Sequence, residues 1–148
     1  MSKLLSRLAA ALLVAGLGTF ALAQDPPEKP KLEGMWMATA GEHNGQKLPD
    51  NMVEGTTFRI NGDKLVAATK DSKEFLNAVV VLNAEKKPCT ITLKLTGSNE
   101  GKHLEGLVER KGDEVKIIYA LLGGEKPTEF KTKDKQVMYT LKMQKTQQ

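Results

Sequence analysis

The stretch Cys89-Thr90-Ile91-Thr92-Leu93-Lys94-Leu95-Thr96 alternates apolar and polar residues without a break. Residues at odd positions are apolar, whereas those at even positions are threonine or lysine. Side chains of a pleated strand point to opposite faces in turn, so this period predicts a β-strand with one buried and one solvated face. Residues 136–143 (QVMYTLKM) repeat the alternation. Strands that each keep one wet face are typical of antiparallel sheets.

The same period continues from Gly34 onward, and clusters of Gly, Asn, Asp and Lys interrupt it. Two of these interruptions, Asn61-Gly62-Asp63 and Lys111-Gly112-Asp113, are short and Gly-centred, as in β-hairpin turns. Many short strands separated by regular turns predict a sandwich or a barrel. The strand near residues 75–83 is the least regular, because FLNAVVVLN is a nearly continuous apolar run. The eight expected strands lie near residues 34–40, 56–61, 64–69, 75–83, 89–96, 103–110, 115–122 and 136–145.

Two longer connections, residues 41–55 and 123–135, follow the first and the seventh expected strands. In an up-and-down order both fall at one end of the molecule, whereas the short hairpin turns fall at the other. The layout predicts a cup with one tightly closed end and one open end. Eight antiparallel strands can close without free edges, around an interior that side chains fill or that holds one small ligand. We therefore expect an all-β fold, an eight-stranded antiparallel up-and-down barrel.

The first 23 residues have the three parts of a secretory signal peptide. Lys3 and Arg7 form the positive n-region, a long apolar run follows, and Ala21-Leu22-Ala23 gives the small-x-small cleavage pattern. The uncharged stretch before the cleavage site is shorter than the roughly 20 residues that span a bilayer. We expect cleavage after Ala23, export to the periplasm or the extracellular space, and a mature chain without a membrane span.

Residues 24–31 (QDPPEKPK) hold three of the six prolines and no large apolar side chain. This composition predicts an extended, flexible spacer ahead of the folded domain, residues 32–148. Removal of the signal peptide takes away Lys3 and Arg7, which supply half of the net charge of +4. The remaining chain is nearly neutral, with Lys and Glu interspersed, so we expect no nucleic-acid partner.

A Gly-x-Trp motif, Gly34-Met35-Trp36, lies on the first expected strand. Gly-x-Trp is found on the first strand of lipocalins, and with further segments it resembles a family of exported bacterial lipocalin-like proteins over about residues 32–145. The resemblance implies an eight-stranded calyx for small apolar ligands, and it carries over no catalytic residue. In lipocalins a basic side chain covers the motif tryptophan, and here Lys142 or Lys145 is expected to do so. The segments are Leu32-Glu33-Gly34-Met35-Trp36, Gly45-Gln46-Lys47-Leu48-Pro49, Lys86-Lys87-Pro88, Gly101-Lys102 with Leu104 and Gly106, Gly112-Asp113, and Pro127-Thr128-Glu129-Phe130.

Strand direction assigns the inward-facing side chains to the upper or the lower half of the cup. Gly34 and Trp36 are expected to form a structural motif at the closed end, because large aromatic residues commonly seal a barrel. Cys89 shares the apolar face of its strand, so we expect a buried, unreactive thiol. For the upper half, the sequence leaves two alternatives undecided, a core filled by side chains and a ligand pocket. The candidate ligand-binding residues there are Phe58, Leu95, Leu104, Tyr119, Leu121 and Tyr139.

No group of residues in the sequence indicates catalysis or a cofactor. A metal site needs three or four ligands, and the strong ones here are His43 and His103, expected as solvated residues at the open end, and Cys89. Ser72 and Ser98 stand outside any Gly-x-Ser-x-Gly turn. No Gly-rich phosphate loop precedes a helix. We expect no enzyme activity, no catalytic residue, no metal and no cofactor.

Two functions fit these expectations. The leading one is an exported barrel without enzyme activity that binds a small apolar or amphipathic molecule in the calyx. The alternative is an envelope protein-interaction or inhibitor module, in which the loops at the barrel mouth contact a protein partner and the barrel is a scaffold. A void of roughly a few hundred Å³ between those loops favours the first function, and a filled interior favours the second.

Overall fold

The computed structural model describes residues 27–144, so the expected signal peptide and its cleavage site lie outside the described residues. All eight expected strands are confirmed. Within this range no helix is long and apolar enough to cross a membrane. The barrel strands are β1 (Gly34–His43), β3 (Thr57–Asn61), β4 (Lys64–Ala68), β5 (Glu74–Asn83), β6 (Cys89–Leu95), β7 (His103–Lys111), β8 (Glu114–Ala120) and β9 (Gln136–Met143).

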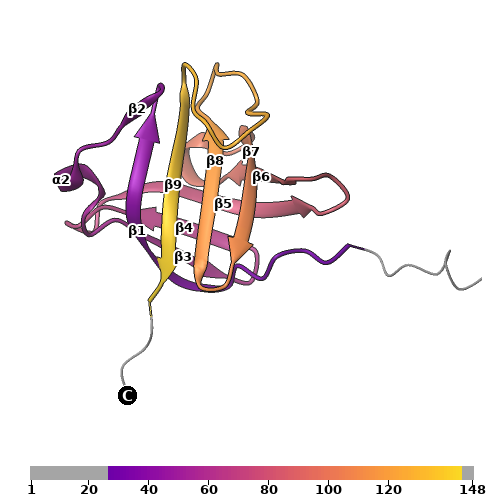
Figure 1. Ribbon diagram of the computed structural model, residues 1–148, viewed down its shortest axis with the longest axis horizontal. Helices are drawn as coiled ribbons and strands as arrows, with labels where there is room; N and C mark the ends of the chain where they lie inside the picture. The colour runs from indigo at the N-terminus through magenta and orange to yellow at the C-terminus, as the bar shows by residue number, and fades with distance from the viewer. Residues whose placement is uncertain (1–26, 145–148) are drawn as a thin grey trace, which may run out of the picture.

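These strands form a closed, eight-stranded antiparallel up-and-down barrel (Figure 1). Each barrel strand pairs with the next one along the chain, and β1 also pairs with β9. Trp36 of β1 lies opposite Phe58 of β3 on one side and opposite Met143 of β9 on the other. Because β1 has hydrogen-bonded neighbours on both sides, its edge is not left open along this stretch.

The connection after β1 is a short hairpin rather than the open loop that we expected. Asn44 (φ 52°) and Gly45 (φ 80°) form a tight turn into β2 (Gln46–Lys47). Two consecutive residues with positive φ are typical of a type I′ hairpin turn, which favours Asn-Gly. One helical turn, α2 (Asp50–Val53), follows and buries Val53. The segment therefore lies folded against β1.

Part of the connection between β8 and β9 folds against the outer face of the barrel at its open end. Gln136 of β9 neighbours the core residue Val137, so its own side chain is on the outer face. Its Nε2 donates to the Glu125 carbonyl (2.8 Å), and its Oε1 accepts from the Lys133 N–H (2.8 Å). Ile118, on the same outer face by alternation, is fully buried. The connection stands at the open end, at the upper ends of β8 and β9 (Figure 1), and its contacts with Gln136 hold part of it against their outer face.

One hydrophobic cluster occupies the middle of the barrel. Gly106 of β7 belongs to the same inner face, and a Cβ placed there would lie 2.0 Å from the Ile118 carbonyl oxygen. Only glycine lets β7 and β8 approach this closely. The largest fully buried side chains of the cluster are Trp36, Phe58, Leu65, Ile91, Leu93 and Leu141.

Cys89 is half-buried, so the expectation of a fully buried thiol is wrong. The residue is the first of β6 and packs against the edge of the core. Strand alternation assigned its face correctly, but its position at the strand end leaves it partly accessible. Burial raises the pKa of the Cys89 thiol. At neutral pH the thiol is therefore protonated, which lowers its reactivity.

Candidate functional site

The closed end of the barrel is built around Trp36. The indole is fully buried, and its Nε1 donates to the Leu32 carbonyl at 2.7 Å. The guanidinium carbon of Arg110, on β7, lies 5.1 Å from the centroid of the indole. Arg110 also donates from Nε to the Gly112 carbonyl (2.7 Å) and from Nη1 to the Lys31 carbonyl. These bonds hold the cation over the ring and attach the segment before β1 to the barrel.

The cation that covers Trp36 is therefore Arg110, and the expectation that Lys142 does so is wrong. Lys142 is exposed and pairs with Met37 and Glu114, on the face opposite to Trp36. Lys145, the other expected residue, lies outside the described residues. Arg110 shares the inward face of β7 with Leu104 because the two positions differ by an even number of residues.

A cluster of three aromatic rings lies below the mouth. Phe58 and Tyr139 have ring centroids 5.1 Å apart, and Phe75 lies 6.1 Å from Phe58 and 6.3 Å from Tyr139. Such separations are within the favourable range for tilted and edge-on ring pairs. The cluster joins the core, through the buried Phe58, to the exposed Phe75 at the mouth.

Phe75 reaches this cluster because β5 contains a bulge. The register between β4 and β5 shifts between Ala67 and Ala68, so that Leu76 pairs with Ala67 and Glu74 pairs with Ala68. Phe75 is the extra residue, and a bulge re-aims the side chain it carries. Strict alternation would have turned Phe75 away from the interior, on the face opposite to Leu76.

A pocket of about 680 Å³ opens at the mouth, between β5, the end of β6 and the start of β7. Its lining is mixed, with leucine and phenylalanine side chains on one part and carboxylate, hydroxyl and amide groups on the other. The 3₁₀ turn η1 (Gly97–Asn99) forms one side of the rim. The lining residues include Phe75, Leu76, Leu95, Leu104, Leu121 and Leu122, with Glu74, Asn77, Thr96, Ser98 and Asn99 as the polar part.

The structure brings three of the six candidate ligand-binding residues, Leu95, Leu104 and Leu121, into this pocket. Phe58 and Tyr119 are buried below it in the core, and Tyr139 is half-buried in the aromatic cluster. Phe75 and Leu122 line the pocket as well, although neither was among the candidate residues. Leu122 follows β8 beyond the last paired residue, where strand alternation no longer applies.

The two tyrosines below the mouth stay neutral over a wide pH range. Burial raises the pKa of Tyr139, and burial together with the nearby Tyr139 raises the pKa of Tyr119. Removing a phenol from water disfavours its charged form. Both hydroxyls therefore stay protonated near neutral pH and do not act as bases.

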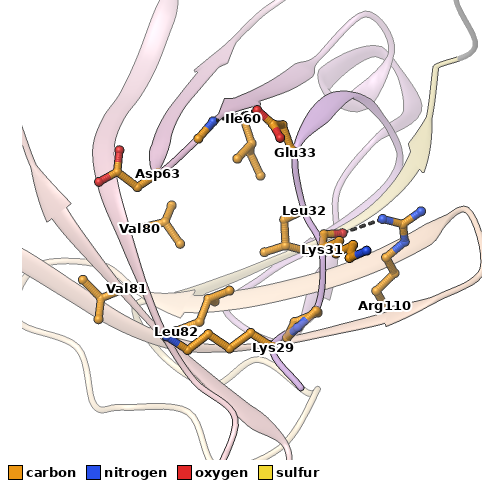
Figure 2. Close-up of a pocket in the computed structure, with 12 residues that line it drawn as sticks. Lys29, Lys31, Leu32, Glu33, Ile60, Asp63, Val80, Val81, Leu82 and Arg110 are labelled. Carbon is orange, nitrogen blue, oxygen red and sulfur yellow. Dashed lines mark hydrogen bonds between the residues drawn. The ribbon is translucent and has the colours of Figure 1, made fainter. Parts of the chain in front are cut away.

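A second pocket, of about 820 Å³, lies at the closed end (Figure 2). Val80, Val81 and Leu82 of β5 form one side, and the segment 29–33 before β1 forms the other. The β3–β4 turn borders the pocket, where the Gly62 N–H donates to Glu33 Oε1 at 3.1 Å. Sequence analysis gave no sign of this pocket.

The β1–β2 turn and the β8–β9 connection are tied together by hydrogen bonds. Thr132 Oγ1 donates to Glu42 Oε1 (2.6 Å) and accepts from the Gly45 N–H (2.8 Å). The Lys135 N–H donates to Asn44 Oδ1 at 2.8 Å. Thr132 is buried although it is polar, so this network fixes the relative position of the two connections.

The two histidines lie on different strands of the open end, His43 at the end of β1 and His103 at the start of β7. Among residues 27–144, no group of three or more His, Cys, Asp or Glu side chains is placed to hold a metal ion.

Comparisons of the chain with family models, with curated proteins and with solved structures find no match.

Proposed function

We propose that the mature chain is an exported, lipocalin-like barrel that binds a small apolar or amphipathic molecule at its mouth. The observation that carries this proposal is the 680 Å³ pocket, whose lining joins leucine and phenylalanine side chains to a polar rim at the open end of the barrel. Pockets of this size and composition suit small ligands. The signal-like residues 1–23 and the Gly-x-Trp motif support export and the resemblance to lipocalins.

The side chains of the core fill the middle of the barrel, and the pocket at the mouth lies beside η1 and not between residues 41–55 and 123–135, where a void was expected to favour ligand binding. The ligand would therefore lie at the mouth and not deep in the barrel. Its apolar part would contact Phe75, Leu104 and Leu121. Its polar end would meet the rim, where Asn77 donates to Glu74 Oε1 at 3.3 Å and Ser98 and Asn99 stand on η1. Glu74 is the one charged residue of the lining, which favours an uncharged ligand over a carboxylate.

The same pocket supports binding rather than catalysis. Its lining holds no histidine, cysteine or lysine. The raised pKa values of Tyr119 and Tyr139 keep both phenols protonated, so neither supplies a base. The proposal therefore includes no enzyme activity and no cofactor.

A neutral apolar dye, N-phenyl-1-naphthylamine, tests the proposal because its emission rises in apolar surroundings. We expect saturable emission with the mature wild-type protein and its loss in Leu121→Lys, which places a charge in the pocket wall. Leu121 is 36% exposed, so this change leaves the core intact. Met52→Lys is the matched control, since Met52 is 61% exposed on α2 and lies outside the pocket lining.

Two results would contradict binding at the mouth. One is the absence of saturable emission with the folded wild-type protein. The other is equal dye binding by Leu121→Lys and Met52→Lys, which would place the dye elsewhere.

A further inference from the structure

The wall of the barrel is incomplete at its closed end, because β5 is longer than its neighbour β4. Pairing between β4 and β5 ends at Lys64 and Val79. Pairing between β5 and β6 continues to Asn83, opposite Thr90. Residues 80–83 of β5 therefore have a strand on one side only.

The free side of β5 presents unpaired backbone groups to the 820 Å³ pocket. Among residues 27–144, the last backbone hydrogen bond on this side joins the Val80 N–H to the Asp63 carbonyl at 2.7 Å. The N–H and C=O of alternate residues point to the same side of an antiparallel strand. The N–H and C=O of Leu82 therefore point away from β6 and toward the pocket, which Leu82 lines (Figure 2).

The β5 strand itself lacks the features that normally prevent an exposed strand edge from pairing with another chain. Exposed strand edges usually carry lysine, proline or a bulge, which prevent pairing with another chain. The stretch Phe75 to Asn83 has no charged residue, proline or glycine. Val81 is 44% exposed, and the only bulge of β5 lies at the opposite end of the strand.

We propose that the β5 edge at Val80 to Asn83 binds an extended segment of a partner protein as an added strand. The Leu82 N–H and C=O would pair with the backbone of the segment, as in other cases of strand addition. Val80 and Leu82 pack against the core, so every second side chain of the segment would face the same apolar floor, with Leu32 and Ile60.

Charge selects the remaining side chains of the segment. Three basic residues line the pocket, Lys29, Lys31 and Arg110, and the Lys29 side chain extends from the segment before β1 across the pocket toward Leu82 (Figure 2). Arg110 and Glu33 both have partners within the protein, Arg110 at Trp36 and two backbone carbonyls and Glu33 at the Gly62 N–H. The other charged lining residues are Lys29, Lys31 and Asp63, so the excess is positive. A segment that alternates apolar and acidic residues therefore fits best. Residues 29–33 stand on the side of β5 from which a second barrel would have to approach.

The test uses the peptide acetyl-Val-Glu-Val-Glu-Val-amide and the ¹⁵N-labelled mature protein. Directly opposed residues of an antiparallel pair share a face, so a valine of the peptide lies opposite Leu82. We expect saturable shifts of the Leu82 amide resonance and slower exchange of its proton. The emission of Trp36, the only tryptophan, should change too, because its neighbours Leu32 and Arg110 line this pocket.

Two matched peptides isolate backbone pairing from apolar contact. N-methylation of the central valine removes an N–H that points at β5, whereas N-methylation of a glutamate removes one that points away. We expect about tenfold weaker binding for the first peptide and little change for the second, since a lost hydrogen bond is worth roughly 1 to 1.5 kcal/mol.

Protein variants test the same contact from the other side. Leu82→Pro removes the N–H that faces the pocket and leaves the pairing with β6, whereas Leu82→Val keeps the N–H. Lys29→Glu should weaken binding of the acidic peptide, and Lys126→Glu, at the open end, should not. The N-methylated peptides keep the test decisive if Leu82→Pro does not fold.

Three results would overturn the proposal. The first is a Leu82 amide that does not respond to millimolar peptide. The second is equal binding of the two N-methylated peptides. The third is a Leu82 response that follows the concentration of the protein itself, or of sodium laurate, without peptide, which would identify a second copy of the chain or an amphiphile as the occupant. Binding of N-phenyl-1-naphthylamine at the mouth is an independent measurement of the proposed function, because it does not depend on the β5 edge.

Discussion

The guanidinium of Arg110 lies over the indole of Trp36, 5.1 Å from its centroid, and joins three separate parts of the closed end. The side chain comes from β7, the ring from β1, and the Lys31 carbonyl that Arg110 also binds precedes β1. One cation thus fixes the start of the folded domain against the base of the barrel. It also sets one wall of the pocket in which the β5 edge is open.

Replacement of Arg110 by alanine should loosen this end of the barrel. The change removes two hydrogen bonds and the cation above the indole, so we expect a loss of about 1 to 2 kcal/mol in the free energy of unfolding. Urea titration followed by Trp36 emission measures it, and the native emission should shift to the red. Arg59→Ala, at an exposed position on β3, should change stability by no more than about 0.5 kcal/mol. Equal effects of the two substitutions would show that Arg110 does not hold the base.

Gly106 should not tolerate a side chain. A Cβ there would lie 2.0 Å from the Ile118 carbonyl oxygen and 2.8 Å from the Tyr119 Cα, both of which belong to the backbone of β8. We expect Gly106→Ala to separate β7 from β8 and to cost more than about 3 kcal/mol, as overpacking in a rigid core does at its upper end. Gly112→Ala is the comparison, because nothing lies within 4 Å of its Cβ and only its positive φ of 62° opposes the change. That variant should lose about 1 kcal/mol. Thermal unfolding of both proteins distinguishes the two cases.

The sequence predicts the strands of this barrel well and its two pockets only in part. The alternation of apolar and polar residues predicted β6 and β9 correctly, because each strand has one face in the core and one toward solvent. It could not have selected Phe75, since a bulge changes the face of the side chain and leaves no mark in the pattern. Arg110 could have been predicted as the cation over Trp36, because it shares the inward face of β7 with Leu104. A charged residue is, however, not expected to face inward.

The pocket at the closed end depends on where strands stop relative to one another. Pairing of β4 with β5 ends at Val79, and the sequence around Val79 to Asn83 shows no change there. The course of the β8–β9 connection depends similarly on one long-range contact, that of Gln136 with Glu125. Local patterns do not contain such contacts, so the structure was needed to see them.

Thr132 should keep the β1–β2 turn and the β8–β9 connection in fixed positions at the open end. Thr132→Val keeps the shape of the side chain but leaves Glu42 Oε1 without a hydroxyl donor and the Gly45 N–H without an acceptor. We expect a cost of about 1 to 2 kcal/mol and faster hydrogen exchange of the Gly45 amide. Thr128→Val, at an exposed position of the same connection, should leave that exchange rate unchanged. Unchanged protection of Gly45 in Thr132→Val would mean that the turn is ordered without this network.

Stability should fall at alkaline pH because two phenols are buried. The pKa of Tyr119 and that of Tyr139 are raised in the folded protein, whereas in the unfolded chain both groups ionise near pH 10. The two neutral phenols therefore make their full contribution to the free energy of unfolding below about pH 10. This contribution is lost as the pH rises above about 10, since only the unfolded chain then releases the protons. The free energy of unfolding, measured between pH 8 and 11.5 in a Cys89→Ala background that removes the thiol, should decrease above pH 10. Phenylalanine in Tyr119→Phe has no proton to release. The free energy of unfolding of this variant should therefore fall less steeply with pH, by up to about 1.4 kcal/mol per pH unit. A slope equal to that of the parent protein would show that Tyr119 ionises as easily in the folded state as in the unfolded one.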